Sequence, residues 1–289
     1  MTDTQSSPVT ADELLRDVKT FFGHGEFFRA YDVAAEALEL FPGDVGLAHR
    51  GVLSLANAGA TALALDKYYE FGLDKRHETD VRSLLGRLKK DQAFAETGEA
   101  RDALFREGRA IYEDAFRNAT AAGDPEAYYP AINAATLAVF AGDDEAAGRL
   151  AGEVLDLLKP RIASLDDVAG DRYWVLATAL EAQLVRGDLD AAGELVGEVV
   201  AAAGTDDAAL ATTARQLERI VAAKELDAGV LTAFKVPTVV HFLGNMDTTT
   251  VAADVDALLD GMHIGAAYGS LASGADILFA ERCLNGASP

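Results

Sequence analysis

Two stretches of the chain, GDDEAAGRLAGEVL at residues 142–155 and GDLDAAGELVGEVV at residues 187–200, are identical at nine of fourteen positions. In each copy a glycine turn and an aspartate precede small residues, and Leu and Val then recur at helical spacing. This pattern predicts an amphipathic helix whose small residues allow another helix to come close. Since such a unit buries its apolar face only by stacking on its neighbours, the repetition predicts an array of helical hairpins.

The same pattern occurs near the N-terminus, in GHGEFFRAYDVAAEALELFPGD at residues 23–44. Ala30 and Ala37 lie seven positions apart and Pro42 follows five later, a spacing that resembles the second helix of a tetratricopeptide (TPR) repeat. Small residues there allow paired helices to pack, and the proline ends the helix. A further second helix is expected between Ala58 and Gly72. The first helices of the pairs are predicted at Ala11–Phe22, Asp44–Asn57, Pro125–Ala141 and Asp171–Arg186, and a capping helix at Asp206–Ala223.

The long helix expected at Glu99–Ala122 departs from this period, and we interpret it as a connector between two sub-arrays. After Phe234 the periodicity changes. Strands are predicted at Val236–Leu243, as a buried strand, and at His263–Tyr268, with helices at Val251–Gly261 and Ala275–Asn285. This β-α-β-α order predicts half of a right-handed, parallel, Rossmann-like unit.

The predicted fold class is therefore mainly α: a TPR-like α-solenoid of helical hairpins with a small C-terminal β-α-β-α, partial Rossmann-like unit. The predicted domains are a disordered lead at residues 1–10, a helical-repeat domain at 11–234 and a partial Rossmann-like segment at 235–289.

The composition limits the classes of partner. A formal net charge of -22 repels phosphate backbones and anionic lipids, so nucleic-acid and membrane-surface binding are not expected, whereas a basic protein partner is favoured. The single cysteine, Cys283, excludes an internal disulfide and is expected to be a small core residue. Because the N-terminus lacks a secretory pattern and no apolar run reaches membrane-spanning length, we expect a cytoplasmic protein.

Three stretches carry a resemblance to a known family: YYPAINAATLAVFAGD (128–143), RYWVLATALEAQLVRGD (172–188) and ATTARQLERIV (211–221). Together they resemble the TRAFs-binding domain, where TRAF denotes tumour-necrosis-factor-receptor-associated factor. That TPR-type domain occurs in the regulatory region of apoptosis signal-regulating MAP kinase kinase kinases and in bacterial proteins. The resemblance implies a regulatory or scaffolding role in signalling.

The C-terminal stretches PTVVHFLGNM (237–246) and YGSLASGADILFAE (268–281) resemble SLOG domains, the Rossmann-like superfamily of cytokinin-activating LOG enzymes and DNA-processing protein A. This resemblance implies a sensor or enzyme for a nucleotide-derived ligand. The sequence departs from the SLOG pattern in three ways. Asn245 stands where a histidine is expected, and the loop before the first Rossmann helix is shorter than expected. A third strand is expected after Gly286, where only three residues follow. We therefore expect the Rossmann-like unit to dock on the helical repeats, to be completed by a second copy in a dimer, or to be truncated.

The glycine-rich turn at residues 269–274 is a candidate phosphate cradle at a helix N-terminus. The candidate ligand-binding residues are Gly244, Asn245, Gly269, Ser270, Ser273, Gly274 and Asp276. In the alternative interpretation, Ser273 and Asp276 form a capping box that satisfies the helix amides, and the Asp276 carboxylate repels an anion. His241 is expected to be a hydrogen-bonded core residue, and the residue pattern predicts no catalytic residue, cofactor or metal site.

Four residues are candidates for a partner-binding groove: Tyr128, Tyr129, Asn133 and Trp174. The aromatic side chains would offer contact area to a peptide. In the alternative, the tyrosines pack against the preceding long helix and Asn133 bonds locally. The basic cluster at residues 75–77 and 82–90 could dock an acidic partner. In the favoured interpretation it is a solvated face that balances nearby carboxylates.

The favoured function is a non-enzymatic, cytosolic protein–protein interaction module in signalling, which docks a peptide or helix in a preformed groove. The open edge of the C-terminal sheet also suggests a homodimer.

Overall fold

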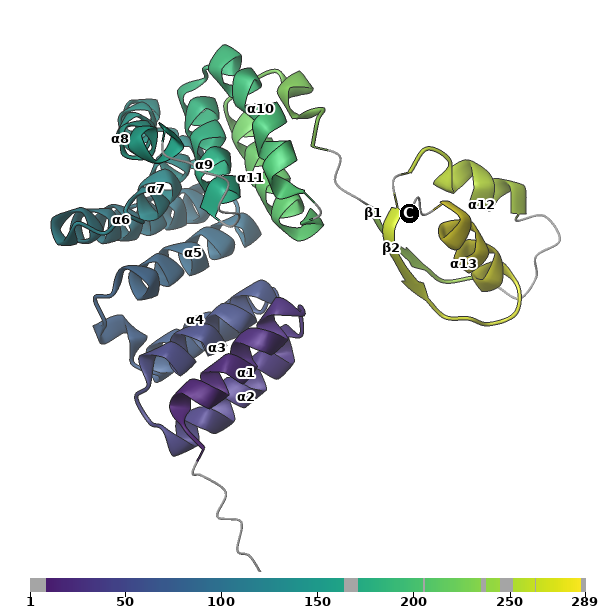
Figure 1. Cartoon of the computed structure of the whole chain (residues 1–289), viewed down its shortest axis with the longest axis horizontal. Helices are drawn as coiled ribbons and strands as arrows, with labels where there is room; N and C mark the ends of the chain where they lie inside the picture. The colour runs from purple at the N-terminus through teal and green to yellow at the C-terminus, as the bar shows by residue number, and fades with distance from the viewer. Residues whose placement is uncertain are drawn as a thin grey trace, which may run out of the picture. The chain divides into compact units, whose positions relative to one another are not determined.

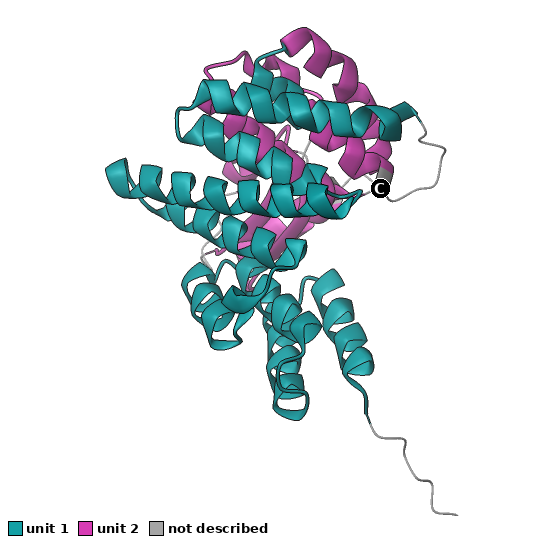
Figure 2. Ribbon diagram, turned by 90° about the vertical axis from the view of Figure 1, so that its left-hand side faces the viewer, with its two compact units in different colours: residues 1–166, 181–188 teal, residues 167–180, 189–289 magenta. Residues whose placement is uncertain are grey.

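The computed structural model describes residues 9–163, 171–204, 206–234, 238–244, 252–262 and 264–286. The predicted disordered lead therefore lies almost wholly outside the described residues. The chain divides into two compact units (Figure 2). The first unit comprises residues 1–166 and 181–188, and the second comprises residues 167–180 and 189–289.

The first unit is built from antiparallel helical hairpins (Figure 1). Its helices are α1 (Ala11–Gly23), α2 (Phe27–Leu40), α3 (Val45–Asn57), α4 (Thr61–Glu70), the 3-10 turn η1 (Leu73–Lys75), α5 (Thr79–Ala95), α6 (Gly98–Ala122), α7 (Tyr128–Phe140) and α8 (Asp144–Ala163). The first helices of successive hairpins, α1, α3, α5 and α7, each contact the next. The helix α9 (Asp171–Arg186) is divided between the two units. The four predicted first helices are confirmed, as α1, α3, α7 and α9, whereas α5 was not predicted.

Glycine–aspartate pairs separate the helices, as the sequence pattern predicts. Gly43 adopts a φ of 83°, and the following Asp44 accepts a hydrogen bond from the amide of Leu47 at 2.9 Å. At the start of α1, Thr10 and Glu13 form the predicted reciprocal capping box. A left-handed glycine followed by a side-chain cap therefore ends one helix and begins the next.

The small residues of the repeated motif have two different roles. Ala147, Ala151 and Ala192 are buried. At four motif glycines, by contrast, an added Cβ would meet no atom within 4 Å: Gly148, Gly152, Gly193 and Gly197. The expectation that these glycines mark close helix contacts is wrong, because their helix surfaces face open space.

Close approach occurs instead between α5 and α6. A Cβ added at Gly86 would lie 2.7 Å from ring atoms of Tyr112, and one at Gly108 would lie 3.2 Å from the backbone oxygen of Gly86. Phe94, Phe105 and Phe140 join α5, α6 and α7 through ring contacts with centroids 5.3–5.4 Å apart. The interpretation of the long helix as a connector is therefore wrong: α6 is the second helix of the third hairpin.

The second unit contains the helices α10 (Leu189–Ala203) and α11 (Asp207–Ala223), the 3-10 turn η2 (Ala228–Leu231), and a β-α-β-α segment. The segment consists of β1 (Thr238–Phe242), α12 (Ala252–Leu259), β2 (Ile264–Gly269) and α13 (Ala275–Gly286). The two strands are parallel, and His241 pairs with Tyr268. Both helices contribute to one apolar cluster with Val240 of β1 and Ile264 of β2.

The prediction of a fully buried first strand is wrong. Only Phe242 of β1 is buried, whereas Val239 is 62% exposed. His241 is exposed as well, and its ring stacks on Tyr268 with centroids 4.5 Å apart, so it is not a core residue. Since both helices pack against the face that carries Val240, alternate strand residues remain uncovered on the other face.

Candidate functional site

Polar side chains connect the first helices of the hairpins to one another. Arg87 of α5 donates to Asn57 Oδ1 of α3 at 2.7 Å, and Lys90 Nζ donates to Asn133 Oδ1 of α7 at 3.2 Å. Thr136 Oγ1 of α7 donates to Glu181 Oε1 of α9 at 2.6 Å. We call these six residues, Asn57, Arg87, Lys90, Asn133, Thr136 and Glu181, the polar ladder. It crosses four successive first helices, α3, α5, α7 and α9.

The ladder combines buried and accessible groups. Asn133 and Thr136 are buried. Tyr129, one turn before Asn133 on α7, is 43% exposed as a whole residue, but its hydroxyl lies inside beside Tyr112, where burial raises the pKa of Tyr129. Arg87 is half-buried and lies 3.5 Å from Asp91 on its own helix. The buried members are rigidly held, and the exposed ring of Tyr129 offers contact area beside them.

Asp80 of α5 adds charge to the same set of helices. It interacts with both His49 and Arg50 of α3. Burial lowers the pKa of His49, and the Asp80 carboxylate opposes that shift. The first helices therefore present both signs of charge.

The four predicted groove residues have different surroundings in the structure. Asn133 Nδ2 donates to the carbonyl oxygen of Tyr129 at 3.0 Å, as the alternative interpretation expects. Tyr128 is buried; its hydroxyl bonds Glu126 at 2.6 Å and the guanidinium of Arg161 lies 5.1 Å from its ring. Tyr128 therefore faces α8 and offers little surface. Trp174 is in the second unit, 48% exposed, with its ring against Tyr173.

Three ladder residues, Asn57, Thr136 and Glu181, carry no signal in the sequence. Arg87 and Lys90 belong to the basic cluster that the sequence pattern indicates as a balanced face. Carboxylates do pair with this basic cluster: Arg82 lies 3.6 Å from Asp114, and Lys89 lies 3.0 Å from Glu107. The amide partners of Arg87 and Lys90 are 30 and 43 residues away along the chain, respectively, so only packing brings them together.

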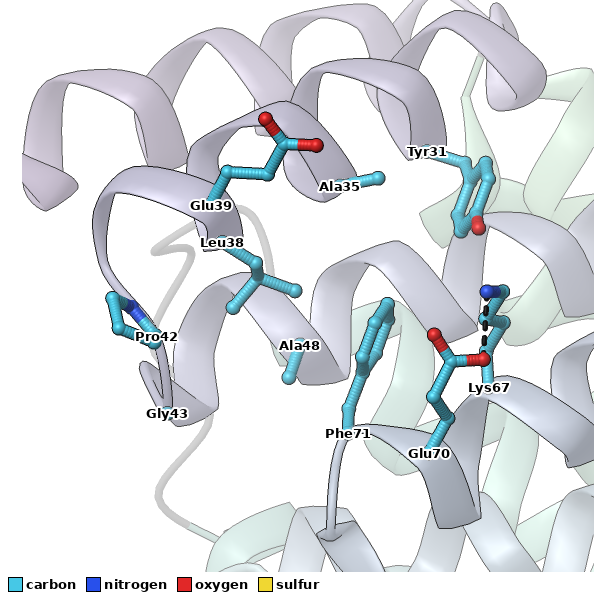
Figure 3. Close-up of a pocket in the computed structure, with 10 residues that line it drawn as sticks. All are labelled: Tyr31, Ala35, Leu38, Glu39, Pro42, Gly43, Ala48, Lys67, Glu70 and Phe71. Atoms are coloured by element: carbon cyan, nitrogen blue, oxygen red, sulfur yellow. Dashed lines mark hydrogen bonds and ion pairs between the residues drawn. The ribbon is translucent and has the colours of Figure 1, made fainter.

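A hollow of about 430 Å³ lies between α2, α3 and α4 (Figure 3). Its floor is apolar, and its polar groups are two glutamates, one lysine and one tyrosine. The lining residues are Tyr31, Ala35, Leu38, Glu39, Pro42, Gly43, Ala48, Lys67, Glu70 and Phe71. Lys67 Nζ lies 2.7 Å from Glu70 Oε2, and this hydrogen bond raises the pKa of Lys67.

The C-terminal turn is occupied by a side chain of the protein. The buried carboxylate of Asp276 accepts hydrogen bonds from the amides of Gly244 and Ala272 and from the hydroxyl of Ser270. These bonds, that of Ser270 first, lower the pKa of Asp276. An added Cβ at Gly269 would overlap Phe242. The absence of a side chain at Gly269 therefore makes room for Phe242 and not for a ligand.

Asp276 therefore takes the position that the cradle interpretation assigns to a phosphate, and its bonds differ from those of the predicted capping box. Ser273 and Gly274 lie in the same turn, and Gly274 has a φ of 106°. Asn245 lies outside the described residues.

A second hollow of about 430 Å³ follows the outer edge of β2, beneath α13. It is lined by residues 264–269 together with Phe242, Leu271, Ala280, Cys283 and Leu284. None of these residues carries a charge. Leu271 and Leu284 are 72% and 79% exposed, and Cys283 is buried as predicted.

Among the described ranges there is no group of three or more His, Cys, Asp or Glu residues placed to hold a metal ion. The described helices include none that is long and apolar enough to cross a membrane.

Comparisons with known proteins address the helical region. Residues 27–138, from α2 into α7, match the family described as Tetratricopeptide Repeats-Sensor (TPR-S). The helical region is TPR-like. A crystal structure of a thermophilic TPR protein from Thermus thermophilus is similar with a TM-score of 0.55 at 15% identity, covering 72% of this chain and 100% of the other. The comparison with curated proteins gave no match.

These findings confirm the predicted fold class of TPR-like hairpins followed by a small parallel sheet. In TPR terms, the polar ladder lies on the first helices of successive repeats.

Proposed function

We propose that this chain is a protein–protein interaction module that holds a partner segment along the polar ladder. The observation that carries the proposal is the run of hydrogen bonds across α3, α5, α7 and α9, with the exposed Tyr129 ring beside it. Amide and hydroxyl groups held in fixed positions can exchange bonds with a peptide backbone without large reorganisation. The TPR-like stacking supports the proposal, because it repeats equivalent positions along one surface.

The finer parts of the proposal come from the sequence. A regulatory role in signalling follows from the resemblance of residues 128–143 to the TRAFs-binding domain, and we propose no enzymatic step and a cytoplasmic location. The net charge of -22 favours encounter with basic partners. We further propose residues 11–234 as the TPR-like domain and residues 235–289 as the partial Rossmann-like segment.

The ladder is tested by the double variant Tyr129→Ala/Asn133→Ala. We expect it to weaken the specific partner by about 30-fold or more, because truncating central contacts typically costs about 2 kcal/mol or more. Partners captured from the host cell by the wild-type chain are quantified by mass spectrometry, and the Kd of the purified partner is then measured for each variant.

The matched control is Arg149→Ala/Glu153→Ala, which removes an exposed ion pair on α8. The control is expected to retain every partner. A ladder variant that melts at the wild-type temperature yet binds each partner with unchanged Kd contradicts the proposal.

A ligand-sensing function through the SLOG-like segment is less well supported. The β-α-β-α order of the predicted unit is present, but Asp276 takes up the amides of Gly244 and Ala272. A phosphate at that position would have to displace a buried carboxylate.

The edge of β2 supports a separate proposal of self-association. Strand edges in monomers are usually protected by charges or prolines, and residues 264–272 contain neither. In a symmetric dimer, a surface patch contacts the same patch of the second copy. Because the chain has a net charge of -22, contact through the uncharged residues 264–272 avoids repulsion between like charges. We therefore commit to a second copy of the chain as the occupant of this edge.

The substitution Ala266→Glu on β2 tests this dimer, with Ala257→Glu on the exposed surface of α12 as control. Light scattering after size-exclusion chromatography is expected to give a dimer for the wild type and the control, and a monomer for Ala266→Glu. A wild-type monomer at all concentrations would rule the dimer out.

A further inference from the structure

The hollow between α2, α3 and α4 has the chemistry of a site for a cation with an apolar stem (Figure 3). Ala35, Leu38, Ala48 and Phe71 form its apolar floor and wall. Leu38 and Phe71 also pack on the buried core of the hairpins, so this surface is fixed by the fold. The hollow can therefore receive a side chain without rearrangement of the helices.

The polar groups of the hollow carry an excess of negative charge. Glu39 and Glu70 lie on either side of the apolar floor, on α2 and α4, and Lys67 is the one cation in the lining. The formal charge of the lining is therefore -1, from two carboxylates and one ammonium. Lys67 bonds Oε2 of Glu70, while among the described residues no bond reaches Oε1 of Glu70 or the carboxylate of Glu39.

The helix ends add to this charge. Both α2 and α4 end at the hollow, at Leu40 and Glu70, and a helix C-terminus carries a partial negative charge. The last turn of α2 contains no basic residue that would offset it, whereas the last turn of α4 contains Lys67. Two carboxylates and two helix C-termini thus make the hollow negative, and the Lys67 ammonium offsets part of this charge.

We propose that this hollow binds an arginine side chain of the partner protein. The aliphatic stem of the arginine lies on Leu38 and Ala48, and its guanidinium bonds the carboxylates of Glu39 and Glu70 near the Phe71 ring. The Lys67 ammonium also lies over that ring, 5.8 Å from its centroid. A guanidinium carries five donors in a fixed fork, so after one carboxylate has taken two N–H groups, further donors remain for a second carboxylate. An ammonium is a compact point charge, which suits one carboxylate better than two separated ones.

This inference deepens the proposed function and rests on it, because the arginine comes from the protein partner. It adds an anchor of defined chemistry at the N-terminal hairpins. Its test uses a small probe that does not need the partner or the polar ladder, so failure of the anchor and failure of the ladder are distinguishable.

The experiment is an NMR titration of the full chain with N-acetyl-arginine amide at about 0.15 M salt, where long-range attraction to the acidic surface is largely screened. Amide shifts are expected to concentrate at residues 35–48 and 67–71, and the probe is expected to bind about tenfold more tightly than the neutral isostere N-acetyl-citrulline amide. The lysine analogue is expected to bind more weakly than the arginine probe.

The variant Glu39→Gln removes one carboxylate without breaking a contact between described residues, and we expect it to weaken the arginine probe about tenfold. Its control is Glu36→Gln, which makes the same charge change on α2 outside the hollow and is expected to leave binding unchanged.

Three results would overturn the inference. They are equal binding of the citrulline and arginine probes, equal weakening by Glu36→Gln and Glu39→Gln, and amide shifts outside the hollow. A lysine probe that binds as tightly as the arginine probe would also overturn the assignment to arginine.

Discussion

Replacing Gly86 by alanine is expected to destabilise the first unit by about 1–2 kcal/mol, although the same change in most helices is stabilising. In an exposed helix interior, alanine is favoured over glycine by about 1 kcal/mol. At Gly86 the new Cβ would lie 2.7 Å from both Cδ2 and Cε2 of Tyr112, a separation that requires the ring to move. Because Tyr112 is fully buried, the ring has no free space, and overpacking of this kind costs about 1–3 kcal/mol.

The matched control is Gly148→Ala in α8 of the same unit. No atom lies within 4 Å of the position of its Cβ, so the propensity gain of about 0.5–1 kcal/mol should appear unopposed. Native-state hydrogen exchange of the first unit's helix amides measures both changes as free energies of opening. The two substitutions should have opposite signs, and stabilisation by Gly86→Ala would contradict the close packing of α5 on α6.

Raising the pH above about 10 is expected to destabilise the first unit, and Tyr68 accounts for part of the loss. Tyr68 is fully buried, and its hydroxyl donates to the carbonyl oxygen of Val81 at 3.2 Å. Burial raises the pKa of Tyr68 to about 12. A tyrosine that is harder to ionise in the folded state contributes its full stability below about pH 10, and the contribution declines as the pH approaches about 12.

The rise of the Tyr68 pKa from 10.0 to about 12 corresponds to a loss of about 2 kcal/mol at a pH of about 12 and of about 3 kcal/mol at higher pH. The variant Tyr68→Phe removes this ionisation together with the hydrogen bond, which is worth about 1 kcal/mol. We therefore expect the variant to be less stable than the wild type at about pH 7 and equal or more stable near about pH 11.5. Urea titrations followed by circular dichroism at both pH values test for this crossover.

The control for this experiment is Tyr69→Phe, one residue further along α4 and 49% exposed. The free energy of unfolding of Tyr69→Phe should decline with rising pH as it does in the wild type. If Tyr68→Phe loses stability at alkaline pH as steeply as the wild type, the buried Tyr68 hydroxyl does not contribute to the alkaline destabilisation.

The sequence by itself determined where most of the helices begin and end, although it predicted no helix at the position of α5. Amphipathic spacing and the Gly-Asp breaks act within a few residues, so α1, α3, α7, α9 and α11 could be predicted to within a few positions, as could the capping box at Thr10. It also determined the TPR-like hairpin class, because units with one apolar face must stack.

Tertiary structure decided which small residues touch and which polar residues meet. Gly148 and Gly86 have the same side chain, yet only Gly86 faces a buried ring, because the partner helix determines which surface of a helix is covered. The polar ladder joins residues 30–45 positions apart, and the Glu39–Glu70 hollow joins two hairpins. Local periodicity contains no information about these contacts, since they depend on how one helix is rotated and displaced against the next.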